Sequence, residues 1–153
     1  MQNEDIGKAV VDRTLWNADA EYKLEAFPNK NLGNDYLISF NIPEYTSLCP
    51  WSGFPDFAII KIRYVPGPKC VELKALKLYV NAFRNTRISH ETVPNRIMND
   101  FIAVCSPKFI EVVGDFGIRG NIKTIVRVAK QFEQISNEVM VQMNDPNFRY
   151  ENA

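Results

Sequence analysis

Two runs in which apolar and polar residues alternate constrain the fold of this chain more than any other feature. The first run spans residues 35–45, and its apolar side chains share one side: Tyr36, Ile38, Phe40 and Ile42. The second run spans residues 56–65 and places Ile60, Ile62 and Tyr64 opposite Lys61 and Arg63. A period of two residues is the spacing of a half-buried β-strand. Because a short polar loop joins the runs, we expect two strands that pair in antiparallel orientation.

The period changes in the middle of the chain. Between residues 71 and 85, apolar residues recur three or four positions apart, which predicts an amphipathic helix. Glu72 in its expected first turn suits the positive end of the helix dipole. A second helix is expected over residues 92–105, with Thr92 as its N-cap and Pro94 in its first turn.

Two more strands are expected over residues 109–116 and 122–130, joined by a glycine-rich turn. Residues 1–34 read as an irregular extension, and residues 131–153 as a tail that is part helix. The order ββααββ predicts one α+β domain over residues 1–153, with an antiparallel sheet and both helices on one face. Bare edges of such a sheet invite pairing between chains, so we expect a homo-oligomer.

The composition argues against several classes of protein. Lys and Arg number 18, as do Asp and Glu, and a chain without net positive charge is a poor candidate for direct nucleic-acid binding. No apolar stretch approaches the ~20 residues of a membrane helix, and the N-terminus lacks a secretory pattern. Three widely spaced cysteines argue against a disulfide framework, and one histidine leaves no metal-ligand set. We therefore expect a metal-free cytoplasmic protein that does not contact a membrane.

Cys49 lies in the loop between the first two expected strands, and Asp56 stands where this loop enters the second strand. A thiol held in such a loop could be a nucleophile, although a free cysteine is also a common buried structural residue. Asp56 could donate a proton to a reacting nitrogen, or it could form an ordinary turn before the strand. Cys70 and Cys105 are interpreted as structural.

Two other polar clusters are candidates for binding. His90 and Glu91 precede the second helix, where the Glu91 carboxylate could accept the N–H edge of a guanine-like base or compensate the helix dipole. Lys74 and Lys77, three residues apart on the first helix, could bind the phosphates of a dinucleotide or form a solvated face. A G-x-G-x-x-G loop is absent, and the segment 114–120 reads as a hairpin turn.

Together these segments resemble the NADPH-dependent 7-cyano-7-deazaguanine reductases of queuosine biosynthesis, the QueF family. The strongest resemblance lies in residues 72–79, Glu-Leu-Lys-Ala-Leu-Lys-Leu-Tyr, which are similar to the signature of that family. Shorter segments are also similar to it: residues 24–29, 46–50, 53–57, 83–85 and 90–91. The resemblance extends from about Tyr22 to Lys130, and the chain length is similar to that of the single-module branch.

The resemblance implies a fold and an assembly. It implies the tunnelling fold, in which subunits join their ββααββ sheets into a ring with active sites between subunits. It also implies a small-molecule deazaguanine substrate and NADPH as the cofactor. Glu72, Lys74 and Lys77 lie in the part of the signature that implies cofactor binding.

The resemblance also implies roles for the candidate site residues. Cys49 corresponds to the nucleophile that adds to the nitrile carbon and gives a covalent thioimide. Asp56 corresponds to the general acid, and His90 assists proton transfer and substrate binding. Glu91 resembles the residue that binds the amide and amino edge of the deazaguanine.

Other functions on the same fold are left open by the residues. Amidino-transferring relatives process deazapurines without reduction, and they are expected to lack the two-lysine helix. A purine-binding module without catalysis is a second alternative, which the presence of both Cys49 and Asp56 disfavours. A zinc cyclohydrolase would need more histidine than this chain contains.

Overall fold

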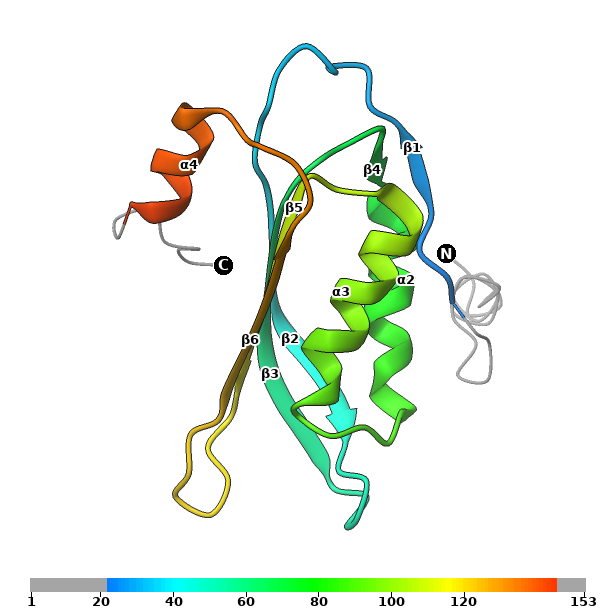
Figure 1. Ribbon diagram of the computed structural model, residues 1–153. Coiled ribbons are helices and arrows are strands. Elements are labelled where there is room, and N and C mark those ends of the chain that lie inside the picture. The colour runs from blue at the N-terminus through cyan, green and yellow to red at the C-terminus, as the bar shows by residue number, and fades with distance from the viewer. Residues whose placement is uncertain (1–21, 146–153) are drawn as a thin grey trace, which may run out of the picture.

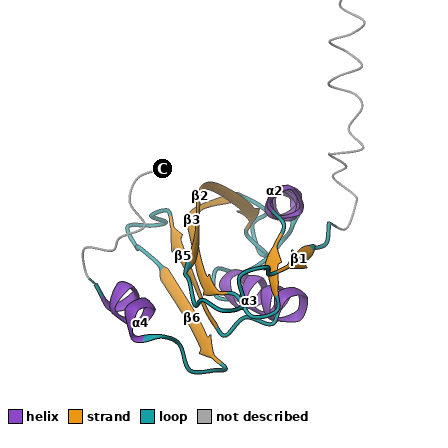
Figure 2. Ribbon diagram, turned by 90° about the horizontal axis from the view of Figure 1, so that it is seen from above, coloured by secondary structure: helices purple, strands orange, loops and turns teal. Residues whose placement is uncertain are grey.

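The computed structural model describes residues 22–145. Its main element is a four-stranded antiparallel sheet in the order β2-β3-β5-β6. The strands have these bounds: β2 Ile38–Leu48, β3 Pro55–Val65, β5 Phe109–Phe116 and β6 Ile125–Gln131. Helices α2 and α3 pack on one face of the sheet, and α4 lies on the other face (Figures 1 and 2). The expected α+β class, the antiparallel sheet and the common face of the two helices are confirmed.

The alternating residues of β3 form the centre of the core. Ile60, Ile62 and Tyr64 are fully buried on the face covered by the helices. They belong to one cluster with fully buried residues of α3 that lie four positions apart: Val93, Ile97 and Phe101. Burial of an apolar side chain of this size contributes roughly 1.5–3 kcal/mol. The core therefore fixes which face of β3 meets the helices.

Helix α2 spans Leu73–Ala82 and continues into the short 3-10 helix η2, Phe83–Asn85. It begins two residues later than predicted because β4, Lys69–Val71, precedes it. Strand β4 pairs in antiparallel orientation with β1, Ala26–Pro28, which lies in the stretch predicted to be irregular. Strands of three residues are too short for alternation to indicate them. The remainder of that extension, residues 1–21, lies outside the described residues.

Helix α3 spans Thr92–Cys105, as predicted, but its start is capped differently. The cap position is Glu91, whose side chain makes no capping hydrogen bond. The hydroxyl of Ser89 instead accepts the N–H of Thr92 at 3.3 Å. Thr92 is therefore the first helical residue and not the N-cap. None of the described helices is long and apolar enough to cross a bilayer.

The two edge strands are displaced from their predicted positions. Strand β2 begins three residues late and extends to Leu48, and its pairing with β3 is irregular between Ile42 and Tyr45. After this irregularity, Tyr45 and Ser47 face the core, where the sequence indicated the strand end and a loop. Strand β6 also begins three residues later than predicted, because the turn that precedes it is longer.

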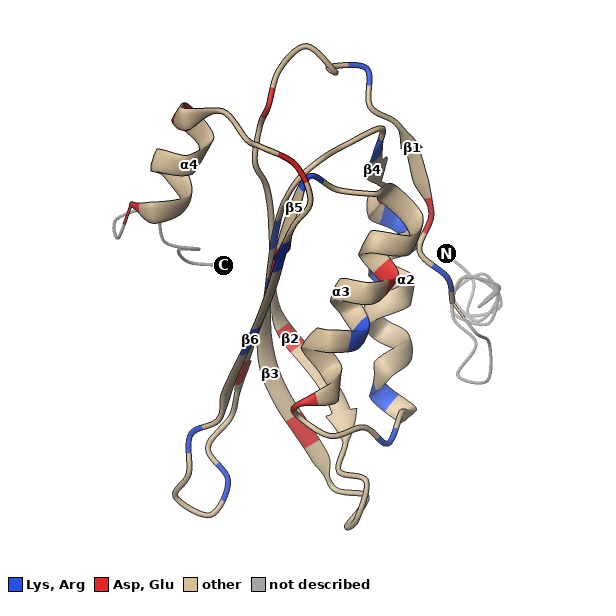
Figure 3. Ribbon diagram, in the orientation of Figure 1, with Lys and Arg blue, Asp and Glu red and all other residues tan. Residues whose placement is uncertain are grey.

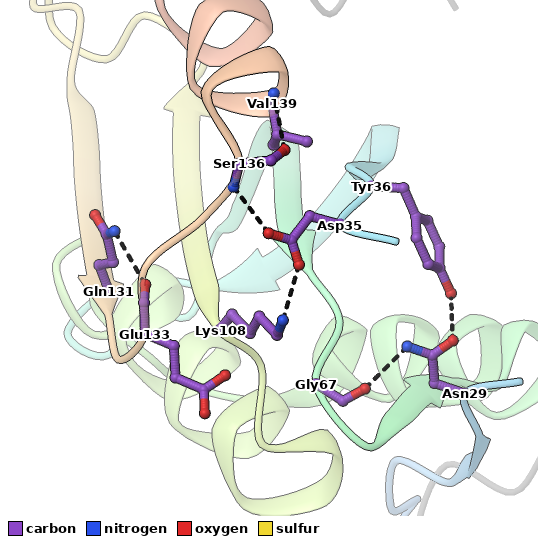
Figure 4. A network of polar contacts seen from close by, with 9 residues as sticks. All are labelled: Asn29, Asp35, Tyr36, Gly67, Lys108, Gln131, Glu133, Ser136 and Val139. Carbon is purple, nitrogen blue, oxygen red and sulfur yellow. Dashed lines mark hydrogen bonds and ion pairs between the residues drawn. The ribbon is translucent and has the colours of Figure 1, made fainter. Parts of the chain in front are cut away.

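The predicted partly helical tail contains α4, Asn137–Asn144. The carboxylate of Asp35 anchors its start, as Figure 4 shows. It accepts one hydrogen bond from the Ser136 N–H and another from Lys108 Nζ, both at 2.8 Å. Asp35 precedes β2 and Lys108 precedes β5, so this one carboxylate ties α4 to two strands of the sheet.

The sheet face beneath α4 contains a buried ion pair. One of its members is Arg63, which the alternation of the sequence had predicted to lie on the polar side of its strand. Arg63 and Glu111 are both buried, and Arg63 Nε lies 2.6 Å from Glu111 Oε1. Arg63 also donates to the carbonyl of Met143 in α4, at 3.0 Å. Arg127 on β6 pairs with the second carboxylate oxygen of Glu111 at 2.9 Å. A buried ion pair needs such further hydrogen bonds, and α4 supplies one of them.

Candidate active site

The loop that follows β2 is a tight turn built around Cys49. The Cys49 N–H donates to the carbonyl of Phe54 at 2.8 Å, and the Gly53 N–H donates to the carbonyl of Cys49 at 2.9 Å. Gly53 has a φ of +72°, in the left-handed region that glycine adopts without strain. The side chains of Trp51 and Phe54 are exposed, at 85 % and 66 %. The turn therefore holds the thiol in a fixed place at the end of the sheet.

The pairing of β2 with β3 brings Cys49 and Asp56 to the same face. Ser47 and Asp56 are direct partners across the two strands. Side chains two residues apart on a strand share a face, so Cys49 continues the side of Ser47, diagonal to Asp56. The charge of Asp56 acts on the pKa of Cys49, which agrees with this proximity. The predicted nucleophile and the predicted acid are thus neighbours across one hairpin.

Hydrogen bonds from its own loop lower the pKa of the Cys49 thiol. The largest cause is the hydrogen bond with the Ser52 hydroxyl, followed by the backbone N–H groups of Ser52 and Trp51. The other two cysteines are buried, and burial raises the pKa of Cys105 to about 12. Because the thiolate is the nucleophilic form, Cys49 is the reactive thiol, while Cys70 and Cys105 lie in the core.

Asp56 lies between two side chains that carry or can accept a proton. It is only 4 % exposed. Its Oδ1 accepts a hydrogen bond from Nη1 of Arg119, and its Oδ2 lies 3.4 Å from Nε2 of His90. The His90 ring stacks on Phe116, with ring centroids 4.0 Å apart and an interplanar angle of 9°. Stacking fixes the imidazole plane, so Asp56 and His90 are held where a proton can pass between them.

Backbone hydrogen bonds hold the segment before α3 beside the end of β2. The Leu48 N–H donates to the carbonyl of Thr86 at 2.9 Å, and the Ile88 N–H donates to the carbonyl of Leu48 at 3.0 Å. This pairing brings His90 to Asp56 although 34 residues separate them in the sequence. Glu91 comes next and is exposed at the start of α3. The structure therefore places the predicted substrate-binding pair at the same end of the sheet as Cys49.

Glu72, which was predicted to contribute to cofactor binding, caps helix α2. Its carboxylate oxygens accept the N–H groups of Ala75 at 2.7 Å and Lys74 at 2.9 Å. These two bonds, in that order of importance, lower the pKa of Glu72. Both oxygens are thus engaged within the chain, and the helix dipole favours the negative charge there. The two lysines of α2 are the better candidates for contacts with a cofactor.

Lys74 and Lys77 are exposed but line different cavities. Lys77 and Arg84 lie on the wall of a cavity of about 400 Å³ between α2 and the edge strand β2. Lys74 lines a second cavity, of about 440 Å³, near the start of α2. Neither cavity is lined by Cys49 or Asp56. Within a single chain, the lysines therefore do not share a cavity with the thiol.

Comparison with known families identifies the group to which this arrangement belongs. The family model described as QueF-like protein matches residues 55–144, which is more than half of the chain. The chain belongs to the QueF-like family. The resemblance predicted from the short sequence motifs is confirmed.

Curated relatives in this family carry the description NADPH-dependent 7-cyano-7-deazaguanine reductase. The protein of Aquifex aeolicus (strain VF5) is 56 % identical over 106 residues, which cover 69 % of this chain and 82 % of the relative. The protein of Prochlorococcus marinus (strain NATL2A) is 53 % identical over 105 residues, 69 % of this chain and 75 % of the relative. That of Synechococcus sp. (strain CC9605) is 49 % identical over 112 residues, 73 % of this chain and 87 % of the relative.

A solved structure shares the fold at much lower sequence identity. The apo form of the archaeosine synthase QueF-Like matches with a TM-score of 0.58 and 18 % identity. The match covers 64 % of this chain and 95 % of that chain. At this identity the match shows that the two chains share a fold.

Sequence reasoning missed Arg119, which belongs to the site. The residue lies in the turn between β5 and β6, which the glycines correctly indicated as a hairpin. The Gly117 N–H donates to the carbonyl of Phe57 at 2.8 Å, and this bond brings the turn to the start of β3. Figure 3 shows basic positions on both arms of the turn. No spacing in the sequence links Arg119 to Asp56, because strand pairing alone brings them together.

Proposed function

We propose that this member of the QueF-like family reduces the nitrile of 7-cyano-7-deazaguanine to the amine of 7-aminomethyl-7-deazaguanine with two NADPH, in queuosine biosynthesis. The observation that carries the proposal is the Cys49 thiol, which has a lowered pKa and lies beside Asp56 and His90. Addition to a nitrile requires such an ionised nucleophile next to a proton donor. The descriptions of relatives about half identical to this chain support the same activity. Three free cysteines favour a reducing compartment such as the cytoplasm.

The first step joins the substrate to the protein. The Cys49 thiolate forms a bond to the nitrile carbon, and one π bond of the nitrile breaks. The electron pair moves to the nitrogen, which takes a proton from Asp56, so the product is a covalent thioimide. His90, with Nε2 3.4 Å from Asp56 and a partly exposed side chain, can pass a replacement proton from solvent to the carboxylate.

Reduction to the amine needs the carbon to stay in place while the cofactor is exchanged. When bound, NADPH supplies one hydride, and a second NADPH supplies the other. The covalent bond to Cys49 activates the carbon for the first hydride and retains the intermediate during the exchange. Cys49 then leaves as a thiolate, and the hydrogen bonds from Ser52 and Trp51 that lower its pKa favour this departure. Asp56 and His90 supply the protons that the nitrogen takes up.

The described residues fit both ligands. The cavity beside α2 combines the ammonium of Lys77 and the guanidinium of Arg84 with the apolar side chains of Leu73, Leu76 and Val80. Cations next to an apolar wall suit a dinucleotide that carries phosphates and flat rings. The exposed Glu91 carboxylate can accept two parallel N–H groups from the deazaguanine edge.

The assembly belongs to the proposal as well. We infer the tunnelling fold, with the sheets of several chains joined into a ring and active sites between chains. Strands β2 and β6 are the two edges of the four-stranded sheet, and among the described residues only the end of β2, at Leu48, is bridged by another segment. Such edges favour pairing between chains. The separation of the lysine cavities from Cys49 within one chain supports a site completed by a second chain.

Intact mass measurement of the protein mixed with 7-cyano-7-deazaguanine, in the absence of NADPH, tests the chemistry. We expect one adduct of substrate mass per chain, no adduct in Cys49→Ala, and release of the aminomethyl product when NADPH is added. Absence of the adduct in the wild-type protein refutes the covalent mechanism. An adduct that NADPH does not discharge indicates a deazapurine-binding relative without reductase activity.

The role of Asp56 is tested separately by Asp56→Asn, which keeps the shape of the side chain but removes the transferable proton. A well-placed acid contributes roughly 10²–10⁴-fold, so we expect turnover to fall by that factor. Substrate affinity, measured by calorimetry in the Cys49→Ala background, is expected to change little. Turnover near the wild-type rate in Asp56→Asn contradicts its assignment as the acid.

A further inference from the structure

Ser47 has a buried hydroxyl group that stability does not explain. The residue is fully buried, and its Oγ makes no hydrogen bond of normal geometry among residues 22–145, although the Tyr45 hydroxyl on the same face lies close enough to interact with it. A buried hydroxyl without a partner costs free energy, and most buried polar side-chain atoms in proteins are hydrogen-bonded. An alanine would fill nearly the same space without this cost. A hydroxyl at such a position indicates a role in function and not in the stability of the fold.

The position of Ser47 shows which group the hydroxyl can serve. Ser47 lies directly opposite Asp56 in the β2–β3 pairing and two residues before Cys49 on the same face. The β-carbons of direct cross-strand partners lie ≈ 4.5–5.5 Å apart, which brings a serine hydroxyl within reach of an aspartate carboxylate. No other residue of β2 is the direct partner of Asp56. The hydroxyl therefore lies next to the proposed acid.

Asp56 has room for another donor. One of its oxygens accepts a hydrogen bond from Arg119, and the other lies 3.4 Å from His90. Two carboxylate oxygens together offer about four acceptor positions. The carboxylate is 4 % exposed, so water cannot readily fill the remaining positions. A buried side chain must supply any further donor.

We infer that Ser47 is a positioning residue for Asp56, an inference that rests on the function proposed above. The proton passes from the Asp56 carboxyl group to the substrate nitrogen, and Asp56 becomes a carboxylate. The Ser47 hydroxyl then donates a hydrogen bond to that carboxylate and keeps its own proton, so no bond to Ser47 is made or broken.

Ser47→Ala tests the inference, because we expect the variant to be slower than the wild type but no less stable. A hydrogen bond to a charged group corresponds to roughly 10–100-fold in rate, so we expect kcat to fall by that factor. KM for 7-cyano-7-deazaguanine is expected to stay within about twofold, since the hydroxyl acts on Asp56 and not on bound substrate. The melting temperature is expected to stay constant or rise, because the variant removes an unpaired buried hydroxyl.

Thr46→Ala is the matched control. Thr46 is the residue before Ser47 on β2 and also carries a hydroxyl, but its side chain lies on the opposite face of the sheet and its cross-strand partner is Phe57. We expect an unchanged kcat. Equal losses of kcat in Thr46→Ala and Ser47→Ala would overturn the inference, because they would report a general disturbance of β2.

A double-mutant cycle shows whether Ser47 acts through Asp56. In the Asp56→Asn background, Ser47→Ala is expected to cause no further loss of adduct formation without NADPH. If the loss in the double variant is instead the product of the losses in the two single variants, the inference is overturned. Wild-type adduct formation tests the proposed function in the same experiment. If the wild type forms the adduct and Ser47→Ala forms it at the same rate, only the role of Ser47 fails.

Discussion

At the scale of single residues, the reactivity of Cys49 comes from its own loop. Many catalytic thiols are paired with a histidine, but the chain has one histidine, and His90 lies against Asp56. The donors that lower the pKa of Cys49 belong to Ser52 and Trp51, three and two positions farther along the chain. The nearby Asp56 acts in the opposite direction. The loop therefore has to offset the negative charge that Asp56 carries whenever it is not protonated.

This balance predicts the behaviour of Ser52→Ala. Loss of the hydroxyl removes the largest cause of the lowered pKa of Cys49, so the pKa rises toward its ordinary value and less thiolate is present at neutral pH. We expect slower alkylation of Cys49 by iodoacetamide at pH 7 and recovery of the wild-type rate at high pH. The measurement is the alkylation rate as a function of pH, followed by mass spectrometry.

The Cys49→Ala variant serves as the baseline for that measurement, because the buried Cys70 and Cys105 should react slowly in the folded protein. Identical pH profiles for Ser52→Ala and the wild type would show that the Ser52 hydroxyl does not control the thiol.

At the scale of secondary-structure elements, α2 combines a structural and a binding role. Its first turn is capped by Glu72, and its exposed lysines face two cavities. Both oxygens of the Glu72 carboxylate accept hydrogen bonds from the helix backbone. Lys77 lines the same cavity as Arg84, so these two cations form the most favourable position near the helix for a cofactor phosphate. The helix and the Cys49 loop can therefore be tested independently.

Lys77→Met separates the two roles, because it keeps the apolar stem of the side chain and removes the charge. One lost charge-assisted hydrogen bond corresponds to roughly tenfold or more in affinity, so we expect KM for NADPH to rise by about that factor. Adduct formation without NADPH is expected to remain at the wild-type rate. Lys30→Met, in the exposed turn after β1, is the control and should leave both quantities unchanged. Slower adduct formation in Lys77→Met would contradict a role confined to the cofactor.

The attachment of α4 gives a second prediction at this scale. The Lys108 hydrogen bond, and then the Ser136 N–H, lower the pKa of Asp35 in the folded protein. Stability from this carboxylate is therefore present above its unfolded pKa and is lost as the pH falls through its folded pKa. For Asp35→Asn we expect a loss of about 1–2 kcal/mol in the free energy of unfolding at pH 7. The difference from the wild type should shrink toward zero at acidic pH.

Urea denaturation of both proteins at neutral and acidic pH measures this difference. Glu133→Gln is the control, because it removes a nearby exposed acidic charge and leaves both hydrogen bonds of Asp35 in place. A loss that is independent of pH would show that the carboxylate charge is not the stabilising feature.

At the scale of the whole molecule, the sheet edges decide whether the proposed ring can form. The Phe116 N–H donates to the carbonyl of Thr124, and ladder bonds alternate along an antiparallel pair, so the N–H of Ala129 on β6 points away from β5. This N–H is a donor available to a strand of another chain. Ala129 is exposed, so a substitution there disturbs little within the chain.

Ala129→Pro removes this outward donor and keeps the ladder with β5, since proline is tolerated on edge strands. We expect the oligomer to dissociate and turnover to fall, because a site between chains would be lost. Light scattering after size-exclusion chromatography measures the mass, and Ala129→Thr, which keeps the N–H, is the control. An unchanged mass for Ala129→Pro would place the interface elsewhere.

The sequence by itself determined the class of fold, the family and the identities of Cys49, Asp56, His90 and Glu91 as candidate site residues. Alternation and helical periodicity are local patterns, and they correctly predicted four main strands, two packed helices and a helical tail. Short segments such as residues 72–79 carry family information that needs no tertiary contact.

Only the tertiary structure decided the contacts between distant parts of the chain. The pairing of β1 with β4, the capping role of Glu72 and the ion pair of Arg119 with Asp56 were not predicted. The irregularity in β2, after which Tyr45 and Ser47 face the core, was also missed. The physical reason is that register and ion pairing depend on which backbone groups meet across the sheet. A periodic pattern indicates which side of a strand is buried, but it does not indicate which residue lies opposite.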